Sequence, residues 1–433
     1  MMNTFFGSSF EQFLLRIQQT FEENTGQKWM ELALGWVLQA GPKTVAGMLR
    51  AVNGIRSRAF SAYYAMLRSQ WFDLRQYWNT IQGILLEGID EGRIRLIVDD
   101  TVLPKVGREI AFCKWHKEFH GETARDNQTV YGQKWVVLAV LWEQPFGVDT
   151  VVSLPVQMAV LTEATTPLEL GREMVNQIRR DHPKRSFLVM GDRSVGGRPF
   201  LWPIPERLDG LVRLKKNAAL YEIPGAYQGR GAPRKKGKRI PTPEELASDE
   251  SLEWTTMEVA RYGQTEQVEV YTTECLWYRV THDVPGRLVI VRDVDTPENW
   301  MALYSTDATM DPKEMIELYC FRWKIETLFR EAKQYGGLGD AQCRTEESVK
   351  RVAPFVMGLV SLVKYWFLCR HEELMDEIRR DDWEQERECP SFQIMVQTLR
   401  WTIRKKQFSQ KMGDDPSLEK KMQDLFNQWT RAA

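Results

Sequence analysis

Residues 93–217 combine two apolar periodicities, and this stretch restricts the fold more than any other part of the chain. Five runs within it are rich in branched apolar residues, three of them in immediate succession: 93–100, 134–142, 149–161, 186–192 and 209–217. Between the third and fourth runs, residues 166–181 carry apolar side chains at helical spacing. Strands mixed with crossover helices are typical of an α/β sheet with buried strands, and three successive strands indicate an antiparallel meander at one edge.

The segments that flank this stretch are helical, because apolar residues recur at helical spacing in 9–90 and again in 351–433. In the first segment, a short helix, a turn at 53–54 and a longer helix from near Ser57 have the outline of a helix-turn-helix. Four cations there are expected to meet DNA phosphates: Lys43, Arg50, Arg56 and Arg58. A helical bundle with a solvated basic face would show the same pattern.

Residues 218–295 predict a β-rich insertion. Four short runs in this region have strand character: 255–260, 267–272, 275–280 and 287–291. The loop at 229–239 is too polar to pack, and it is expected to follow the DNA backbone, although a solvated linker would also fit. Its six cations are Arg230, Arg234, Lys235, Lys236, Lys238 and Arg239.

These patterns divide the 433 residues into five regions. They are an N-terminal helical DNA-binding domain (1–90), the first part of an α/β core (91–217), the insertion (218–295), the second part of the core (296–350) and a C-terminal helical region (351–433). The most apolar stretch, 355–368, contains Lys364 and is too short to span a bilayer, so no membrane partner is expected. Scattered cysteines and the lack of a signal-peptide pattern favour a cytoplasmic protein with free thiols.

Acidic residues follow two of the predicted strands. Asp99 and Asp100 end the first strand and Asp192 ends the fourth, and the carboxyl ends of strands are where sites form in open α/β sheets. A third acid, Glu326, lies on a helix of about 24 residues with an Asp-Pro start and a Gly-Gly end. Three such carboxylates can hold two Mg²⁺ ions roughly 3.5–4 Å apart, an arrangement that suits phosphodiester cleavage.

Four side chains on that helix form one stripe. At 100° per residue, Tyr319, Arg322, Glu326 and Lys333 fall within roughly 60° of arc. The carboxylate can bind a divalent metal, the cations can hold phosphates, and the phenol can stack or donate a hydrogen bond. A surface salt bridge between Arg322 and Glu326 is the alternative interpretation.

Together these motifs resemble the DDE transposases of bacterial insertion sequences, in particular the subgroup with the signature Tyr-x2-Arg-x3-Glu-x6-Lys. The signature is intact from Tyr319 to Lys333, and VDDTVLPK at 98–105 and MGDR at 190–193 match the motifs of the two aspartates. The resemblance covers roughly residues 90–350. It implies an RNase H-like catalytic core, a mixed five-stranded sheet with helices, which is interrupted by a β-rich insertion.

The resemblance also implies the roles of individual residues. The implied catalytic residues and metal ligands are Asp100, Asp192 and Glu326, and the implied DNA contacts are Tyr319, Arg322 and Lys333. Two Mg²⁺ ions are the implied cofactors, and Mn²⁺ is expected to substitute for them. Adjacent residues of a strand point to opposite faces. The resemblance favours Asp100 over Asp99, which would then cap or support it.

The implied activity is DNA transposition. The enzyme would bind the ends of an insertion sequence, cleave phosphodiester bonds by two-metal-ion hydrolysis, and join the 3′-hydroxyl ends to target DNA. Its partners would be double-stranded DNA and, on that DNA, a second copy of the chain, in the bacterial cytoplasm at the nucleoid. Two alternatives are an RNase H-like nuclease without strand transfer and a non-catalytic DNA-binding protein derived from a transposase.

The formal net charge of -1 conceals a separation of charge along the chain. Residues 213–239 hold nine Lys and Arg against one Glu, whereas 240–260 hold six acids and no Lys or Arg. Residues 372–388 hold nine acids and three Arg. Near-neutrality therefore excludes a uniformly basic DNA-binding surface, and it predicts a DNA path made of local basic patches around an acidic centre.

Overall fold

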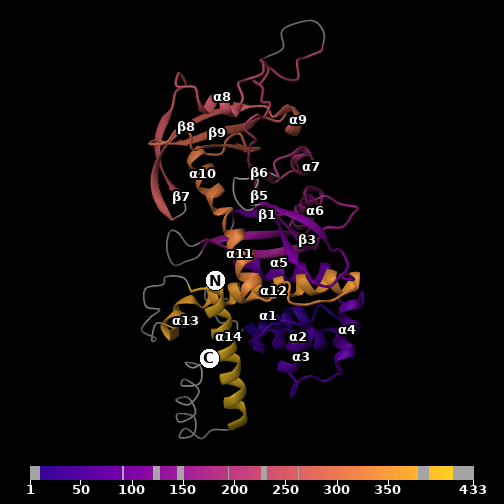
Figure 1. The fold of residues 1–433 in the computed structure, drawn as a ribbon. Coiled ribbons are helices and arrows are strands. Elements are labelled where there is room, and N and C mark those ends of the chain that lie inside the picture. Colours follow the sequence, from indigo (N-terminus) through magenta and orange to yellow (C-terminus); the bar gives the residue numbers. More distant parts are fainter. Residues whose placement is uncertain are drawn as a thin grey trace.

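The structure is a computed structural model, and it describes residues 10–89, 92–119, 127–143, 151–193, 195–225, 232–261, 263–378 and 390–412. Within these ranges, ten strands form one mixed sheet. Figure 1 shows the helices of the two chain ends gathered at one end of the molecule and the insertion strands at the other, with the core strands between them. The predicted α/β fold is confirmed.

Five strands form the RNase H-like core in the spatial order β4-β3-β1-β5-β6. Their bounds are β1 (Arg93–Pro104), β3 (Asn127–Glu143), β4 (Val151–Val160), β5 (Ser186–Gly191) and β6 (Leu208–Arg213). β3 runs antiparallel to β1 and β4, and β1, β5 and β6 are parallel to one another. A further strand that the sequence did not predict, β2 (Lys114–Phe119), pairs with the first part of β3.

Helix α6 (Pro167–Asp181) covers one face of the core sheet and is the crossover between β4 and β5. It begins with a capping box, in which Thr166 N donates to the Glu169 carboxylate over 2.9 Å and Glu169 N donates to Thr166 Oγ1 over 3.3 Å. Gly171 allows close contact with the sheet, since a Cβ at this position would lie 3.0 Å from the side chain of Val98. The side chain of Val98 therefore marks the α6 face of β1.

The insertion continues the core sheet. Its elements are α8 (Pro243–Ala247), β7 (Thr255–Arg261), β8 (Gln264–Cys275), α9 (Tyr278–Thr281) and β9 (Gly286–Asp293), followed by β10 (Trp300–Ser305). β10 pairs antiparallel with β6 on one side and with β9 on the other. The predicted strand at 275–280 is wrong, because β8 ends at Cys275 and a short helix follows.

The helices of the two chain ends pack together below the sheet (Figure 1). They are α1 (Phe10–Gln18), α2 (Glu23–Leu38), α3 (Val45–Ala51), α4 (Phe60–Arg68) and α5 (Leu74–Glu87), with α12 (Glu346–Cys369), α13 (His371–Ile378) and α14 (Phe392–Met412). Aromatic rings join them: Trp29 meets Phe355 edge-on at 6.0 Å between centroids, and Phe10 meets Trp366 at 6.2 Å. α12 is long and apolar enough to cross a membrane, but its apolar window is 94% buried inside the protein, so it is the central core helix.

The predicted helix of about 24 residues is two helices. α10 (Pro312–Phe321) begins as expected, with Glu314 N donating to Asp311 Oδ1 over 3.0 Å, and α11 (Lys324–Gln334) carries the remainder. Between them the backbone tightens, since Arg322 N donates to Tyr319 O, three residues earlier, over 3.1 Å. The single-helix prediction is therefore wrong at this junction, where no Gly or Pro marks the change.

Candidate active site

Asp99 and Asp100 lie on opposite faces of β1. Asp100 Oδ2 is 2.8 Å from Lys134 Nζ of β3, on the face that α6 covers. Asp99 Oδ2 is 3.4 Å from the Arg322 guanidinium, at the junction of α10 and α11. Because the two residues are neighbours in the strand, alternation of side chains alone separates their carboxylates. The structure therefore does not bring Asp100 to the helix that carries Glu326.

Asp192 joins Asp99 on the same face. The pairing of Ile97 with Met190 sets β1 against β5, and two residues further along each strand are Asp99 and Asp192. Asp192 ends β5 in a turn, where Val195 N donates to its Oδ1 over 3.2 Å. Asp192 follows the end of β5, as the sequence predicts, whereas Asp99 lies level with it inside β1, which continues to Pro104 and does not end at Asp100.

Arg322 is the cation that these acids share. Its guanidinium is 3.4 Å from Asp99 and 3.7 Å from Glu326 Oε1, one turn further along the helix. Burial lowers the pKa of Arg322, but the charges of Tyr319, Asp99, Asp192 and Glu326 raise it, and the net shift is upward. The Arg322 guanidinium thus balances part of an acidic cluster.

The pKa values of Asp99 and Glu326 also indicate that these acids lie close to Asp192 and Arg322. Burial is the main cause that raises the pKa of Asp99 to about 7. The hydrogen bond from Asp100 N and the charge of Arg322 lower this pKa, and the charges of Asp192 and Asp100 raise it. Burial also raises the pKa of Glu326, which Arg322 lowers and Asp192 raises again. Mutual repulsion of this kind requires carboxylates that lie close together. Asp99, Asp192 and Glu326 form one electrostatic unit, which we call the acidic cluster.

Tyr319 supports the acidic cluster from within the protein. Its side chain is 6% exposed, and the Arg322 guanidinium lies 5.7 Å from the centre of its ring. Burial raises the pKa of Tyr319, and the charges of Arg322 and Arg213 lower it. Arg213, at the end of β6, is thus a second cation beside the site. In the sequence, Arg213 is marked only as part of the basic stretch 213–239.

The part of the chain that holds the acidic cluster matches a known protein family. The family model of the transposase DDE domain matches residues 91–353, more than half of the chain. The chain belongs to the transposase DDE domain family. A comparison with curated protein sequences finds no match. The match covers the strands and helices that bring the acidic cluster together.

The transposase DDE domain places its carboxylates in a setting that fits a hard divalent cation. All three donors are carboxylate oxygens, the ligands that Mg²⁺ and Mn²⁺ prefer over His and Cys. Among the residues that the structure describes, no three His, Cys, Asp or Glu side chains are already grouped at metal-binding distance. Instead, Arg322 lies between two of the acids.

The three predicted DNA contacts of the Tyr-Arg-Glu-Lys signature differ in how exposed they are and in what they face. Lys333 lies in α11, two turns beyond Glu326, and is half-buried. Arg322 is directed toward the acids, and its side chain is 15% exposed. Tyr319 is buried under Arg322, which is at odds with the expectation that its ring stacks on DNA.

Lys43 corrects a prediction. Its side chain is 3% exposed, and its ammonium donates to the main-chain oxygens of Trp36 and Gln39, the latter over 2.5 Å, at the end of α2. Burial lowers its pKa to about 7. A cation enclosed in this way caps a helix and cannot reach a DNA phosphate. The charge pattern of the sequence predicts a basic face that includes Lys43, because such a pattern does not show burial.

The other predicted cations of the N-terminal region lie at the surface around the turn between α3 and α4. Arg50 and Arg58 are exposed. Arg56 is half-buried, because it donates to Asn53 Oδ1 over 2.9 Å and lies 4.7 Å from the ring centre of Phe60. The short helix, turn and second helix are present as expected, and Arg50 and Arg58 are the cations of this group that face solvent.

The basic loop of the insertion is partly described. Arg230 lies outside the described residues, and Arg234, Lys235, Lys238 and Arg239 are exposed at the surface. Lys236 is instead held by two aromatic rings, with its ammonium 3.9 Å from the ring centre of Tyr221 and 5.1 Å from that of Tyr278. The other described cations of the loop are exposed to solvent, which a contact with the DNA backbone requires.

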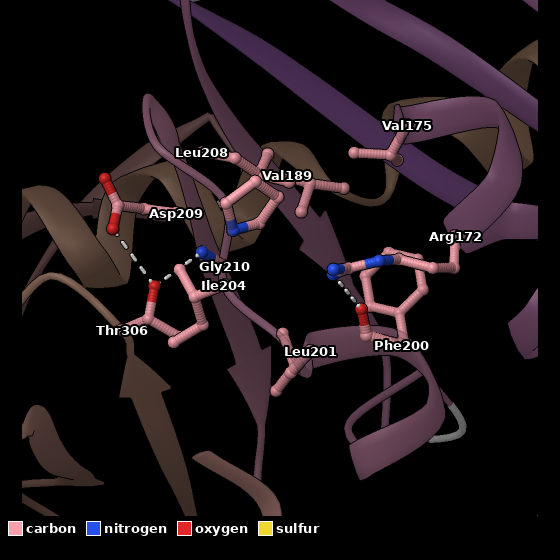
Figure 2. Close-up of a pocket in the computed structure, with 11 residues that line it drawn as sticks. Arg172, Val175, Val189, Phe200, Leu201, Ile204, Leu208, Asp209, Gly210 and Thr306 are labelled. Atoms are coloured by element: carbon pink, nitrogen blue, oxygen red, sulfur yellow. Dashed lines mark hydrogen bonds between the residues drawn. The ribbon is translucent and has the colours of Figure 1, made fainter. Parts of the chain in front are cut away.

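A small hollow on the opposite face has no part in this chemistry. Figure 2 shows it between α6 and the core sheet, where Arg172 donates to Phe200 O over 2.6 Å and Thr306 Oγ1 donates to Asp209 Oδ1 over 3.1 Å. Its lining is mostly apolar. Val189 pairs with Leu96, three residues before Asp99, so the hollow lies on the α6 face.

Proposed function

We propose that this chain is a Mg²⁺-dependent DNA transposase of a bacterial insertion sequence. It binds the ends of the element as double-stranded DNA, cleaves them by two-metal-ion hydrolysis, and joins the 3′-hydroxyl ends to target DNA. The observation that carries the proposal is the convergence of Asp99, Asp192 and Glu326 around Arg322, within a chain of the transposase DDE domain family. The charge of Asp192 raises the pKa of both Asp99 and Glu326, as expected for carboxylates gathered at a functional site.

Asp99, and not Asp100, is the first acid of the proposed triad. The charge of Asp192 raises the pKa of Asp99, and the Asp99 carboxylate meets Arg322. Asp100 is paired with Lys134 on the α6 face. We assign Asp100 to the stability of the β1–β3 pair.

Each residue of the acidic cluster has a task in the proposed reaction. The carboxylate oxygens of Asp99, Asp192 and Glu326 would hold the divalent ions. When bound, such ions stabilise the charge that develops on the attacking and leaving oxygens of a phosphodiester. A water molecule and then the freed 3′-hydroxyl attack in line, so the chain needs no Ser or Tyr nucleophile. Arg322 holds the Asp99 carboxylate in place and screens its repulsion from Glu326.

The proposed DNA path follows the cations that face solvent or border the site. Arg213 lies at the end of β6, where its charge acts on Tyr319, and Lys333 lies two turns beyond Glu326 on α11; both can hold phosphates that flank the reacting one. Arg50, Arg58 and the surface cations of the insertion loop extend the path to both ends of the molecule. A homodimer on DNA would bring two element ends together.

End cleavage tests the proposal. The Glu326→Gln variant keeps the size of the side chain but loses its charge, and in Mg²⁺ it should bind a duplex of the element's end and leave it uncut. Cleavage by Glu326→Gln at the rate of the parent chain would refute the proposal. Cleavage by the parent chain without strand-transfer products on a gel would identify a nuclease instead.

A further inference from the structure

Two aromatic side chains form an exposed pair on the β2–β3 hairpin. Trp115 is 69% exposed, and its ring lies 5.5 Å from that of half-buried Tyr131, at an interplanar angle of 56°. They are direct partners in the antiparallel ladder, so both side chains leave the same face of the hairpin. We call Trp115 and Tyr131 the hairpin platform.

The hairpin platform faces the same side of the sheet as the acidic cluster. Val137 of β3 is the partner of Asp99, and Tyr131 precedes Val137 by six residues, an even number. At about 3.3 Å per residue, six residues along β3 correspond to about 20 Å. One DNA strand advances about 3.4 Å per nucleotide, so this span is about six nucleotides.

The surroundings of the platform are basic and polar. Lys114 and Lys117 on β2 and Arg108 on the preceding loop are exposed, and Lys117 is on the same face as Trp115, two residues further along the strand. The Tyr131 hydroxyl donates to Arg108 O over 3.3 Å, which fixes the ring beside this loop. Exposed rings among cations favour a nucleic acid over an apolar protein surface, because bases stack on the rings while cations meet the phosphates.

Stability of the hairpin does not account for the exposure of Trp115. A cross-strand aromatic pair stabilises a two-stranded ribbon, but β-branched residues do so as well without exposing an indole to water. An indole that is 69% exposed leaves a ring face available for stacking.

We propose that the hairpin platform binds unpaired bases of the DNA on which the acidic cluster acts. This inference rests on the proposed function, and it assigns to Trp115 and Tyr131 the segment about six nucleotides from the reacting phosphate. Bases are exposed when a duplex is opened or distorted, and an aromatic surface takes them regardless of sequence. The occupant is therefore an unstacked stretch of nucleotides, not a particular base.

Fluorescence anisotropy without divalent ions tests the platform on the full chain. The two probes are a labelled duplex of about 30 base pairs and the same duplex with about three mismatched pairs at its centre. The parent chain should bind the mismatched probe about tenfold more tightly, the contribution of roughly one stacked base. Trp115→Ile should lose most of that preference while binding the paired duplex normally, because isoleucine keeps the strand and removes the ring.

Two further variants complete the test. Trp115→Phe should restore the preference, and Trp71→Ile, at an indole that is 61% exposed between α4 and α5, should leave it unchanged. Equal preference in the parent chain and Trp115→Ile would overturn the inference, as would a change of oligomeric state with no change in DNA preference. If the paired duplex still bound normally, the platform inference would fail and the proposed function would stand. If the parent chain bound neither probe, both the inference and the proposed function would be contradicted.

Discussion

The carboxylates of Asp99 and Asp100 point to opposite faces of the central sheet, although the residues are adjacent in β1. Asp99 meets Arg322 at 3.4 Å, and Asp100 meets Lys134 at 2.8 Å. Only the first of these contacts connects β1 to the helix that bears Glu326. The acidic cluster of this transposase DDE domain is therefore defined by which face of a strand a residue occupies.

Removal of Arg322 should make the metal-free protein less stable. In Arg322→Ala, Asp99 and Glu326 lose their shared counter-ion, and we expect the free energy of unfolding to fall by about 2 kcal/mol. Mg²⁺ should then raise the melting temperature of the variant more than that of the parent chain, because it replaces the lost positive charge. Thermal unfolding with and without Mg²⁺ measures both effects. If Mg²⁺ raised the melting temperature of Arg322→Ala and of the parent chain equally, Mg²⁺ would not replace the charge of Arg322.

Asp99 should make stability depend on pH in the absence of metal. Its pKa is about 7 in the folded chain, against 3.8 for an exposed aspartate, so the folded state binds this proton more tightly. The associated stability is present below about pH 4 and is lost as pH rises toward 7. At about 1.4 kcal/mol per pKa unit, the loss is at most about 4 kcal/mol. In urea unfolding, the free energy of unfolding should fall less with rising pH in Asp99→Asn than in the parent chain. An equal fall in both proteins would contradict the burial of Asp99.

The five core strands and the outline of the site were predictable from sequence, because branched apolar runs and acids near strand ends are local patterns. The choice between Asp99 and Asp100 was not predictable, since it depends on the register of β1 against β3 and β5. The junction at Arg322 also escaped the sequence analysis, because packing tightens a helix whose residues all suit a regular one. Glu326 and Lys333 share α11, whereas Tyr319 lies on α10 and Arg322 lies at the junction between the two helices.

Burial and long-range pairing explain the remaining differences. Lys43 lies in a basic stretch, yet tertiary packing encloses it between the end of α2 and Asp340, whose Oδ2 accepts from Lys43 N over 2.6 Å. The insertion was expected as a distinct β-rich region, and its strands continue the core sheet because β10, a strand that was not predicted, pairs with β6. Neither relationship has a signature in neighbouring residues.

Lys43 and Arg58 should differ in DNA binding. Lys43→Met should leave the affinity for a duplex of about 30 base pairs and its salt dependence unchanged, because the side chain is enclosed. Arg58→Ala removes an exposed cation and should reduce the slope of log K against log salt by about one. A salt titration followed by fluorescence anisotropy measures both slopes. A reduced slope of log K against log salt in Lys43→Met would show that Lys43 does contact DNA.

The ion pair between Lys364 and Glu331 should anchor α11 to α12. Lys364 Nζ lies 2.6 Å from Glu331 Oε2, and the lysine side chain is 6% exposed. Lys364→Met leaves a carboxylate unpaired in a largely buried position and should cost about 3–5 kcal/mol of stability. Adding Glu331→Gln should recover part of that loss in urea unfolding. Strictly additive losses would show that the two side chains do not interact.

The most direct test of the proposed triad compares Asp99→Asn with Asp100→Asn in Mg²⁺-dependent cleavage of a duplex of the element's end. Asp99→Asn should bind that duplex but cleave it at least about 1,000-fold more slowly, because it removes a metal ligand. Asp100→Asn should cleave within about tenfold of the parent rate, because Asp100 lies on the α6 face with Lys134. Full activity in Asp99→Asn together with loss of activity in Asp100→Asn would contradict the assignment.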